Sequence, residues 1–69
     1  MEVKLGRVPG VVTEWTLREG ATVKDLLDIA DEKLDPTDAL RVNGIDASTS
    51  TVLVDGDKLL ITMKVKGNK

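Results

Sequence analysis

Residues 22–34 decide the fold and read Thr-Val-Lys-Asp-Leu-Leu-Asp-Ile-Ala-Asp-Glu-Lys-Leu. Their apolar positions recur with helical spacing and form a single stripe, which consists of Val23, Leu26, Leu27, Ala30 and Leu34. Thr22 is a suitable N-cap, and Asp25 is a favourable acidic residue for the first turn. Asp35-Pro36 should end the helix, because a residue before proline is biased away from helical geometry. The stretch therefore predicts one amphipathic helix over residues 23–34.

The residues before this helix predict a β-hairpin. Residues 2–7 alternate, with Val3 and Leu5 on one face, and residues 11–17 are rich in β-branched and aromatic side chains. Pro9-Gly10 lies between them and is a strong turn signal. We therefore expect two strands joined by a turn at the N-terminal end.

The residues after the helix predict short strands and then one long strand. The two short strands are joined by Asn43-Gly44, which is the preferred two-residue turn pair, and a turn at 55–57 precedes the last strand. The expected segments are strands at 39–42 and 45–47, an extended or 3₁₀ piece at 51–54, and the final strand at 58–65.

These elements predict a two-layer α+β domain, because one amphipathic helix can cover only one face of a small sheet. The first and last strands have the best alternating patterns, so we expect them to lie centrally and parallel. The order of β-hairpin, helix, short strands and long C-terminal strand is that of a β-grasp. We expect residues 1–69 to form a single domain, with a flexible tail at 66–69.

The composition argues against catalysis. The chain has 69 residues, of which 41% are hydrophobic, and it contains neither Cys nor His. Thiolate nucleophiles, imidazole bases, disulfides and zinc sites of the Cys/His kind are therefore excluded. A chain of this size also offers little room for a deep pocket. We expect a protein that is not an enzyme and that needs no metal and no cofactor.

The charges and apolar runs limit the classes of partner. Ten basic residues are scattered among twelve acidic ones, which gives a net charge of −2 and does not favour nucleic acid. The apolar runs are far too short to span a membrane, and no signal peptide is recognisable. We expect a cytoplasmic protein with a protein partner, present as a monomer or a weak homodimer through exposed sheet edges.

A series of short segments runs from about residue 19 to the end of the chain. In order they are Glu19-Gly20-Ala21-Thr22-Val23 with Leu26-Leu27, then Leu34-Asp35-Pro36, Val42-Asn43-Gly44, Ser50-Thr51-Val52-Leu53 and Gly56-Asp57. In this order the chain resembles a known family, the small sulfur-carrier proteins of thiamin and molybdopterin biosynthesis (the ThiS/MoaD group of the ubiquitin-like β-grasp superfamily).

The functional motif of that family differs here. The carriers end in Gly-Gly, whose terminal carboxylate an adenylating enzyme activates for replacement by sulfur. This sequence ends Val65-Lys66-Gly67-Asn68-Lys69, so only Gly67 matches. We therefore expect a non-catalytic ubiquitin-like module that binds a protein. The alternative is a divergent sulfur carrier, whose partners the resemblance implies to be an adenylating enzyme or a synthase subunit.

The candidate partner-binding residues lie on the strand parity opposite the core or in the tail. In this superfamily the exposed sheet face commonly binds partners, and apolar residues there are informative if they form a contiguous patch. Ile45 is a further candidate for the same face. The candidate residues are Val12, Leu60, Thr62, Lys64, Lys66 and Gly67.

Other notable residues have two readings each. Trp15, the one aromatic residue, is either a core residue or a binding anchor. The acidic pairs Asp35/Asp38 and Asp55/Asp57 suit turn chemistry far better than a calcium site. The acids of the helix form either a solvated face or a docking surface for a basic partner, and they are Asp25, Asp28, Asp31 and Glu32.

Overall fold

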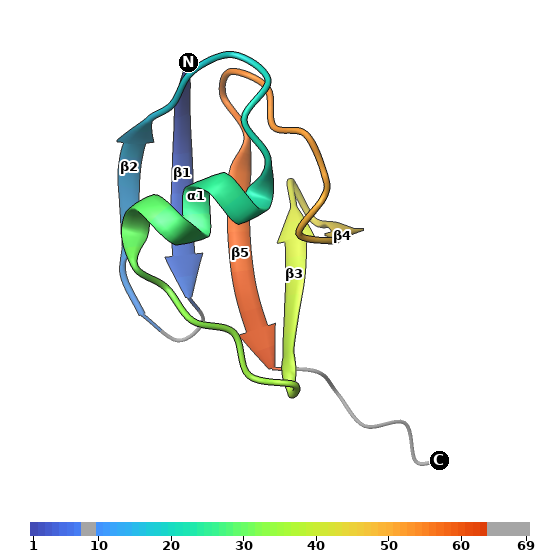
Figure 1. Cartoon of the computed structure of the whole chain (residues 1–69). Coiled ribbons are helices and arrows are strands. Elements are labelled where there is room, and N and C mark those ends of the chain that lie inside the picture. The colour runs from blue at the N-terminus through green and yellow to red at the C-terminus, as the bar shows by residue number, and fades with distance from the viewer. Residues whose placement is uncertain (8–9, 64–69) are drawn as a thin grey trace.

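The computed structural model describes residues 1–7 and 10–63, which form a five-stranded mixed sheet crossed by one helix (Figure 1). In chain order the elements are β1 (Glu2–Arg7), β2 (Val12–Thr16), α1 (Val23–Ala30), β3 (Asp38–Val42), β4 (Ile45–Ala47) and β5 (Lys58–Met63). The strands lie in the order β2-β1-β5-β3-β4. β1 pairs parallel with β5 and antiparallel with β2. The predicted α+β β-grasp, with central and parallel first and last strands, is confirmed.

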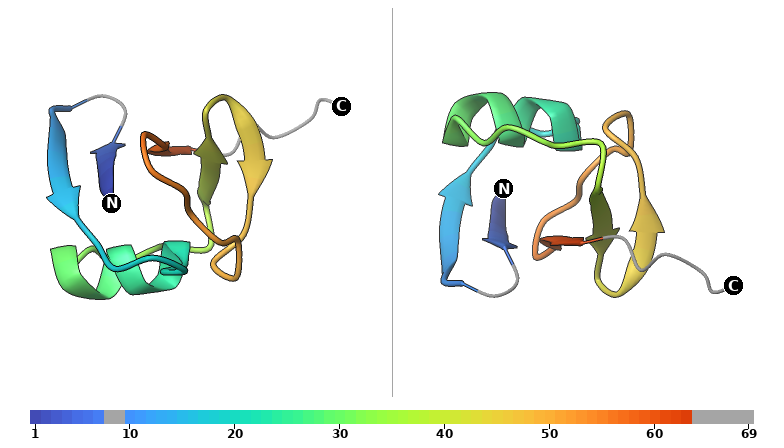
Figure 2. Two further views of the ribbon diagram at one scale, coloured as in Figure 1. Left: turned by 90° about the horizontal axis from the view of Figure 1, so that it is seen from above. Right: turned by 90° about the horizontal axis from the view of Figure 1, so that it is seen from below.

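The core lies between the helix and one face of the sheet. Figure 2 shows α1 on one side of the strands only. The largest fully buried side chains come from both layers and from the loop before β5, and they are Val3, Val23, Leu26, Leu53, Leu59 and Ile61. Ala30 and Leu34 are half-buried against this cluster. The predicted apolar stripe therefore faces the sheet along its whole length.

The helix begins as the sequence predicts. Thr22 Oγ1 accepts from the backbone N–H of Asp25 at 3.3 Å, and an Asp25 carboxylate oxygen accepts from the N–H of Thr22 at 2.9 Å. This is a capping box, in which two unpaired donors of the first turn are satisfied reciprocally. The N–H groups of Val23 and Lys24 donate to the carbonyls of Thr51 and Thr49, which joins the helix start to the loop before β5.

The helix ends earlier than predicted, at Ala30 instead of residue 34. Asp31 adopts left-handed backbone geometry with φ of 57°, which Asp tolerates better than most residues. The N–H of Glu32 then donates to the carbonyl of Leu27 at 2.9 Å, the long bond of a Schellman motif. Leu34 still packs on the core, but from the loop.

Among the described residues, no helix is long and apolar enough to cross a membrane.

The remaining predicted elements agree with the structure in most respects. The turn at Asn43-Gly44 has φ of 54° and 83°, as a two-residue hairpin turn requires. Within 51–54 a single β-bridge joins Val52 to Thr22. β5 is described as far as Met63, so the predicted strand residues 64 and 65 and the predicted tail at 66–69 lie outside the described residues.

Candidate functional site

One row of side chains crosses the sheet face opposite the helix, with one residue from each strand. Gly6 of β1 pairs with Val12 of β2 and with Leu60 of β5. Leu60 in turn pairs with Arg41 of β3, which pairs with Asp46 of β4. Because paired residues in a sheet point to the same face, these five positions form a continuous line across the open face.

Gly6 brings the two large apolar residues of this row close together. A Cβ atom placed on Gly6 would lie 2.8 Å from Cγ2 of Val12 and 3.1 Å from Cδ2 of Leu60. The space above the β1 backbone is therefore filled from both sides by these neighbouring side chains. Thr62 and Ala39, a directly paired couple on β5 and β3, continue the same face beside Leu60. We call these five residues, Gly6, Val12, Ala39, Leu60 and Thr62, the outer strip.

The structure brings together three of the residues that the sequence singled out. Val12, Leu60 and Thr62 belong to the outer strip, and Lys64, Lys66 and Gly67 lie outside the described residues. The expectation that Ile45 shares this face is wrong. Ile45 pairs with Val42 on the helix side of the sheet, where it remains 72% exposed because β4 extends past the helix.

Gly6 and Ala39 are the members of the outer strip that the sequence did not single out. Gly6 has the strand parity opposite to Val3 and Leu5, so the alternation of the first strand already placed it on the open face. The register between strands was the missing information, because it alone shows that Gly6 lies between Val12 and Leu60.

Within residues 1–7 and 10–63, the charges around the outer strip balance. Lys4, Lys58 and Arg41 lie on the same face as Glu2, Glu14 and Asp46, as the strand registers show. Arg41 and Asp46 form an exposed ion pair at 3.4 Å, and such pairs contribute little free energy. The apolar side chains, and not a net charge, therefore distinguish this face.

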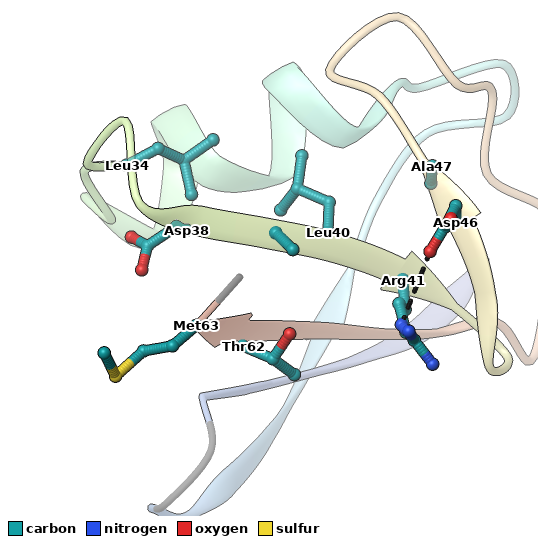
Figure 3. Close-up of a pocket in the computed structure, with 9 residues that line it drawn as sticks. Leu34, Asp38, Leu40, Arg41, Asp46, Ala47, Thr62 and Met63 are labelled. Atoms are coloured by element: carbon teal, nitrogen blue, oxygen red, sulfur yellow. Dashed lines mark ion pairs between the residues drawn. The ribbon is translucent and has the colours of Figure 1, made fainter. Parts of the chain in front are cut away.

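A hollow of about 690 Å³ borders the outer strip at Thr62. The hollow lies where β4 ends, because the beginning of β3 has no neighbouring strand there. Figure 3 shows Leu34, Asp38 and Met63 at one end of the hollow. The Arg41–Asp46 pair lies at the other end. Met63, which the alternation places on the core face of β5, is 71% exposed here. The described lining of the hollow combines apolar side chains with polar and charged ones, so it offers room for contact.

Arg7 holds the loop between α1 and β3, which contributes Leu34 to the lining of this hollow. Its guanidinium donates to Glu32 at 3.0 Å, to the carbonyl of Lys33 at 3.1 Å and to Asp38 at 3.3 Å. The backbone N–H of Asp35 donates to the same Asp38 oxygen at 3.0 Å. The N–H of Asp35, and after it the Arg7 guanidinium, lower the pKa of Asp38. In return, Glu32 and to a smaller extent Asp38 raise the pKa of Arg7.

One acid of each pair serves a turn, as the sequence predicts, whereas Asp55 joins its turn to the start of β1. Asp57 accepts from the backbone N–H of Val54, Asp55 from that of Glu2 and Asp38 from that of Asp35. Among residues 1–7 and 10–63, no three acidic side chains gather in a way that could hold a metal ion.

Trp15 and the helix acids lie away from the outer strip. Trp15 is half-buried against the core, and its indole N–H donates to Thr13 Oγ1 at 2.7 Å. Asp28 is exposed on α1, Asp31 is exposed directly after the end of α1, and Asp25 is committed to the capping box. The interpretation of Trp15 as a core residue is therefore supported in part, because the residue is only half-buried.

Comparison with known proteins places this architecture. No protein-family model and no curated protein matches the chain. The crystal structure of SAMP1 from Haloferax volcanii matches with a TM-score of 0.77 and 18% identity, over 99% of this chain and 100% of that one. The chain has a ubiquitin-like β-grasp fold. A second crystal structure, of the H. volcanii small archaeal modifier protein 1, matches this ubiquitin-like chain with a TM-score of 0.75 and 18% identity, over 93% of it and 98% of that chain.

A ubiquitin of Caldiarchaeum subterraneum is similar as well. Its structure matches with a TM-score of 0.61 and 21% identity, over 99% of this chain and 98% of that one. The matches extend over nearly the whole length of both chains. At these identities the likeness concerns the fold.

Proposed function

We propose that this ubiquitin-like chain is a non-catalytic module that binds a protein partner through its outer strip. The convergence of Val12 and Leu60 over Gly6 from the two neighbouring strands is the observation that carries the proposal. Apolar residues scattered singly on a surface need no explanation, whereas a contiguous group on one face indicates an interaction site. The hollow beside Thr62 gives a partner side chain a place to enter.

The chemistry of the face supports a protein partner over a small ligand. The outer strip lies on a sheet face and is not enclosed, so it would leave most of a small molecule in water. Its apolar centre within balanced charges has the usual anatomy of a protein interface, an apolar core with a polar rim.

Site-specific crosslinking in the source organism tests the proposal. A photo-reactive residue at Thr62 should capture one partner reproducibly, and mass spectrometry identifies it. The purified partner should then bind the wild-type chain and lose at least tenfold in affinity with Leu60→Asp, because a charge would be buried in the apolar contact.

The matched control is Ile29→Asp. Ile29 is exposed on α1, on the far side of the sheet, so this change adds the same charge without touching the outer strip. Equal loss of binding in both variants, or crosslinks spread over many proteins, would remove the basis of the proposal.

A modifier or sulfur-carrier role is the second candidate. It is favoured by the similarity to SAMP1 over 99% of this chain and by the family resemblance of the sequence. In that role an adenylating enzyme would activate the C-terminal end, and Gly67 would be the terminal residue. The intact mass of natively expressed protein tests it. The expected species ends at Gly67 or carries sulfur in place of one oxygen, and a full-length unmodified chain argues against this role.

A further inference from the structure

The outer edge of β2 carries a full set of backbone groups that no described residue satisfies. The N–H of Leu17 donates to the carbonyl of Met1 at 2.8 Å. Alternation along an antiparallel pair then makes Val3–Trp15 and Leu5–Thr13 the hydrogen-bonded couples. The residues between them on β1 turn toward β5, as the 2.9 Å bond from Lys4 N–H to the carbonyl of Asp57 shows.

The intervening residues of β2 therefore turn outward. These are Val12, Glu14 and Thr16, and each presents one N–H and one C=O. Figure 1 shows β2 at the margin of the sheet, with no described element beyond it. An edge of this kind is a template for another strand, and strand addition is a recurrent mode of peptide recognition.

Glu14 decides which strand can join. A second copy of this chain would satisfy all the outward groups in the antiparallel register that places Glu14 opposite Glu14 of the second copy. Like charges directly opposite each other destabilise a pair of strands. Lys4 lies on the inner side of Glu14, whereas the second copy approaches from the outer side.

We propose that the free edge of β2 receives an extended segment of a protein partner that carries a lysine or arginine opposite Glu14. The backbone of β2 supplies the hydrogen bonds. Glu14 determines the specificity, because its carboxylate favours a cation on the arriving strand and repels an identical strand. The half-exposed ring of Trp15 lies on the helix side of the same strand and adds apolar contact for the arriving segment. This inference does not depend on the outer strip, although Val12 belongs to both.

The chain itself provides a defined probe. In Glu14→Lys the β2 strand is unchanged except for a cation at its centre. Wild type and Glu14→Lys should each be monomeric alone, since each would oppose like charges. An equimolar mixture should form a heterodimer, seen in sedimentation equilibrium as a doubling of the 7.5 kDa monomer mass. Protein concentrations up to about 1 mM make even a weak complex visible.

Controls make the result specific to the edge. Asp28→Lys reverses a charge on the exposed side of α1 and should leave its mixture with wild type monomeric. Glu14→Thr removes the repulsion with a good strand former and should self-associate, which keeps the test valid even if Glu14→Lys folds poorly. On mixing, the amides of Val12, Glu14 and Thr16 should exchange with deuterium more slowly, whereas those of Thr13 and Trp15 are already protected.

The outcome is decisive in either direction. A heterodimer that forms only with Glu14→Lys and protects the three outward amides supports the proposal. A mixture that stays monomeric, or a wild-type chain that dimerises alone through this edge, overturns it. Neither result bears on Leu60→Asp, so failure here and failure of the proposed function are distinguishable.

Discussion

Asn43 and Asp57 hold two turns together at one end of the sheet. The side-chain amide of Asn43 donates to Asp57 Oδ1 at 2.8 Å, and its oxygen accepts from the N–H of Lys58 at 3.1 Å. The second oxygen of Asp57 accepts from the N–H of Val54 at 2.9 Å. Asp57 is 7% exposed, the one buried charged residue in the described part of the chain. The β3–β4 turn and the start of β5 are therefore positioned by one another.

Replacing Asp57 with alanine should destabilise the fold by about 2–3 kcal/mol, because it removes hydrogen bonds to a buried charged group and leaves part-buried donors without their partner. Urea denaturation measures the change. Asp55→Ala is the matched control within the same turn. Asp55 is exposed and accepts a single backbone bond, so its loss should cost less than about 1 kcal/mol. Equal effects of the two variants would contradict the central role given to Asp57.

Leu27→Ala should destabilise by about 2–5 kcal/mol, as a large-to-small change in a buried site does. Leu27 is buried between α1 and the sheet. Ile29→Ala, two residues along the same helix, alters an exposed side chain and should change the free energy of unfolding by about 0.5 kcal/mol or less. A loss under half a kcal/mol for Leu27→Ala would mean that the helix does not pack as described.

The sequence predicts the layers of this fold because its patterns are local. The spacing of Val23, Leu26 and Leu27 is read within one helix, and the alternation of Val3 and Leu5 within one strand. The end of the helix depends on distant residues: Arg7 binds Glu32 and the carbonyl of Lys33, and these contacts hold residues 32–37 as a loop. The apolar periodicity of the sequence extends to Leu34 because this side chain still packs on the core, although its backbone is not helical.

The candidate surface was predictable in part for the same reason. The parity of Val12, Leu60 and Thr62 within their own strands places them opposite the core. Their proximity depends on the parallel register of β1 and β5, which pairs Gly6 with Leu60, and no pattern within a single strand contains that register. Ile45 was misplaced because the face of β4 is set by its pairing with Val42 across the turn.

The left-handed geometry of Asp31 gives a prediction of opposite sign for two substitutions. Asp31→Gly should leave the fold unchanged or stabilise it by up to about 1 kcal/mol, since glycine has no steric penalty at positive φ. Asp31→Val should destabilise it by about 1–2 kcal/mol, because a β-branched residue strongly disfavours this region. Thermal unfolding of both variants provides the measurement. A helix that in fact continues to residue 34 would reverse the order, because valine is then tolerated better than glycine.

Acid should weaken the fold through Asp38 and Asp25. The backbone N–H of Asp35 and then Arg7 lower the pKa of Asp38, and the Thr22 cap lowers that of Asp25. A carboxyl whose pKa is lower in the folded state stabilises the fold fully above its ordinary value near 3.8. This contribution is lost as the pH falls through the lower folded-state pKa.

Urea midpoints measured between about pH 6 and pH 2 should therefore fall on the acid side, where the folded carboxylates become protonated. Asp38→Asn should flatten this dependence, because the asparagine cannot change charge. It should also lower stability at neutral pH, because it weakens the hydrogen bond and ion pair between Arg7 and residue 38. Asp25→Asn should flatten it separately, and the double variant should show both effects, since Asp25 lies in the first turn of α1 and Asp38 at the start of β3. Single variants whose midpoints follow the wild-type pH curve in parallel would show that neither carboxylate is held by the contacts described.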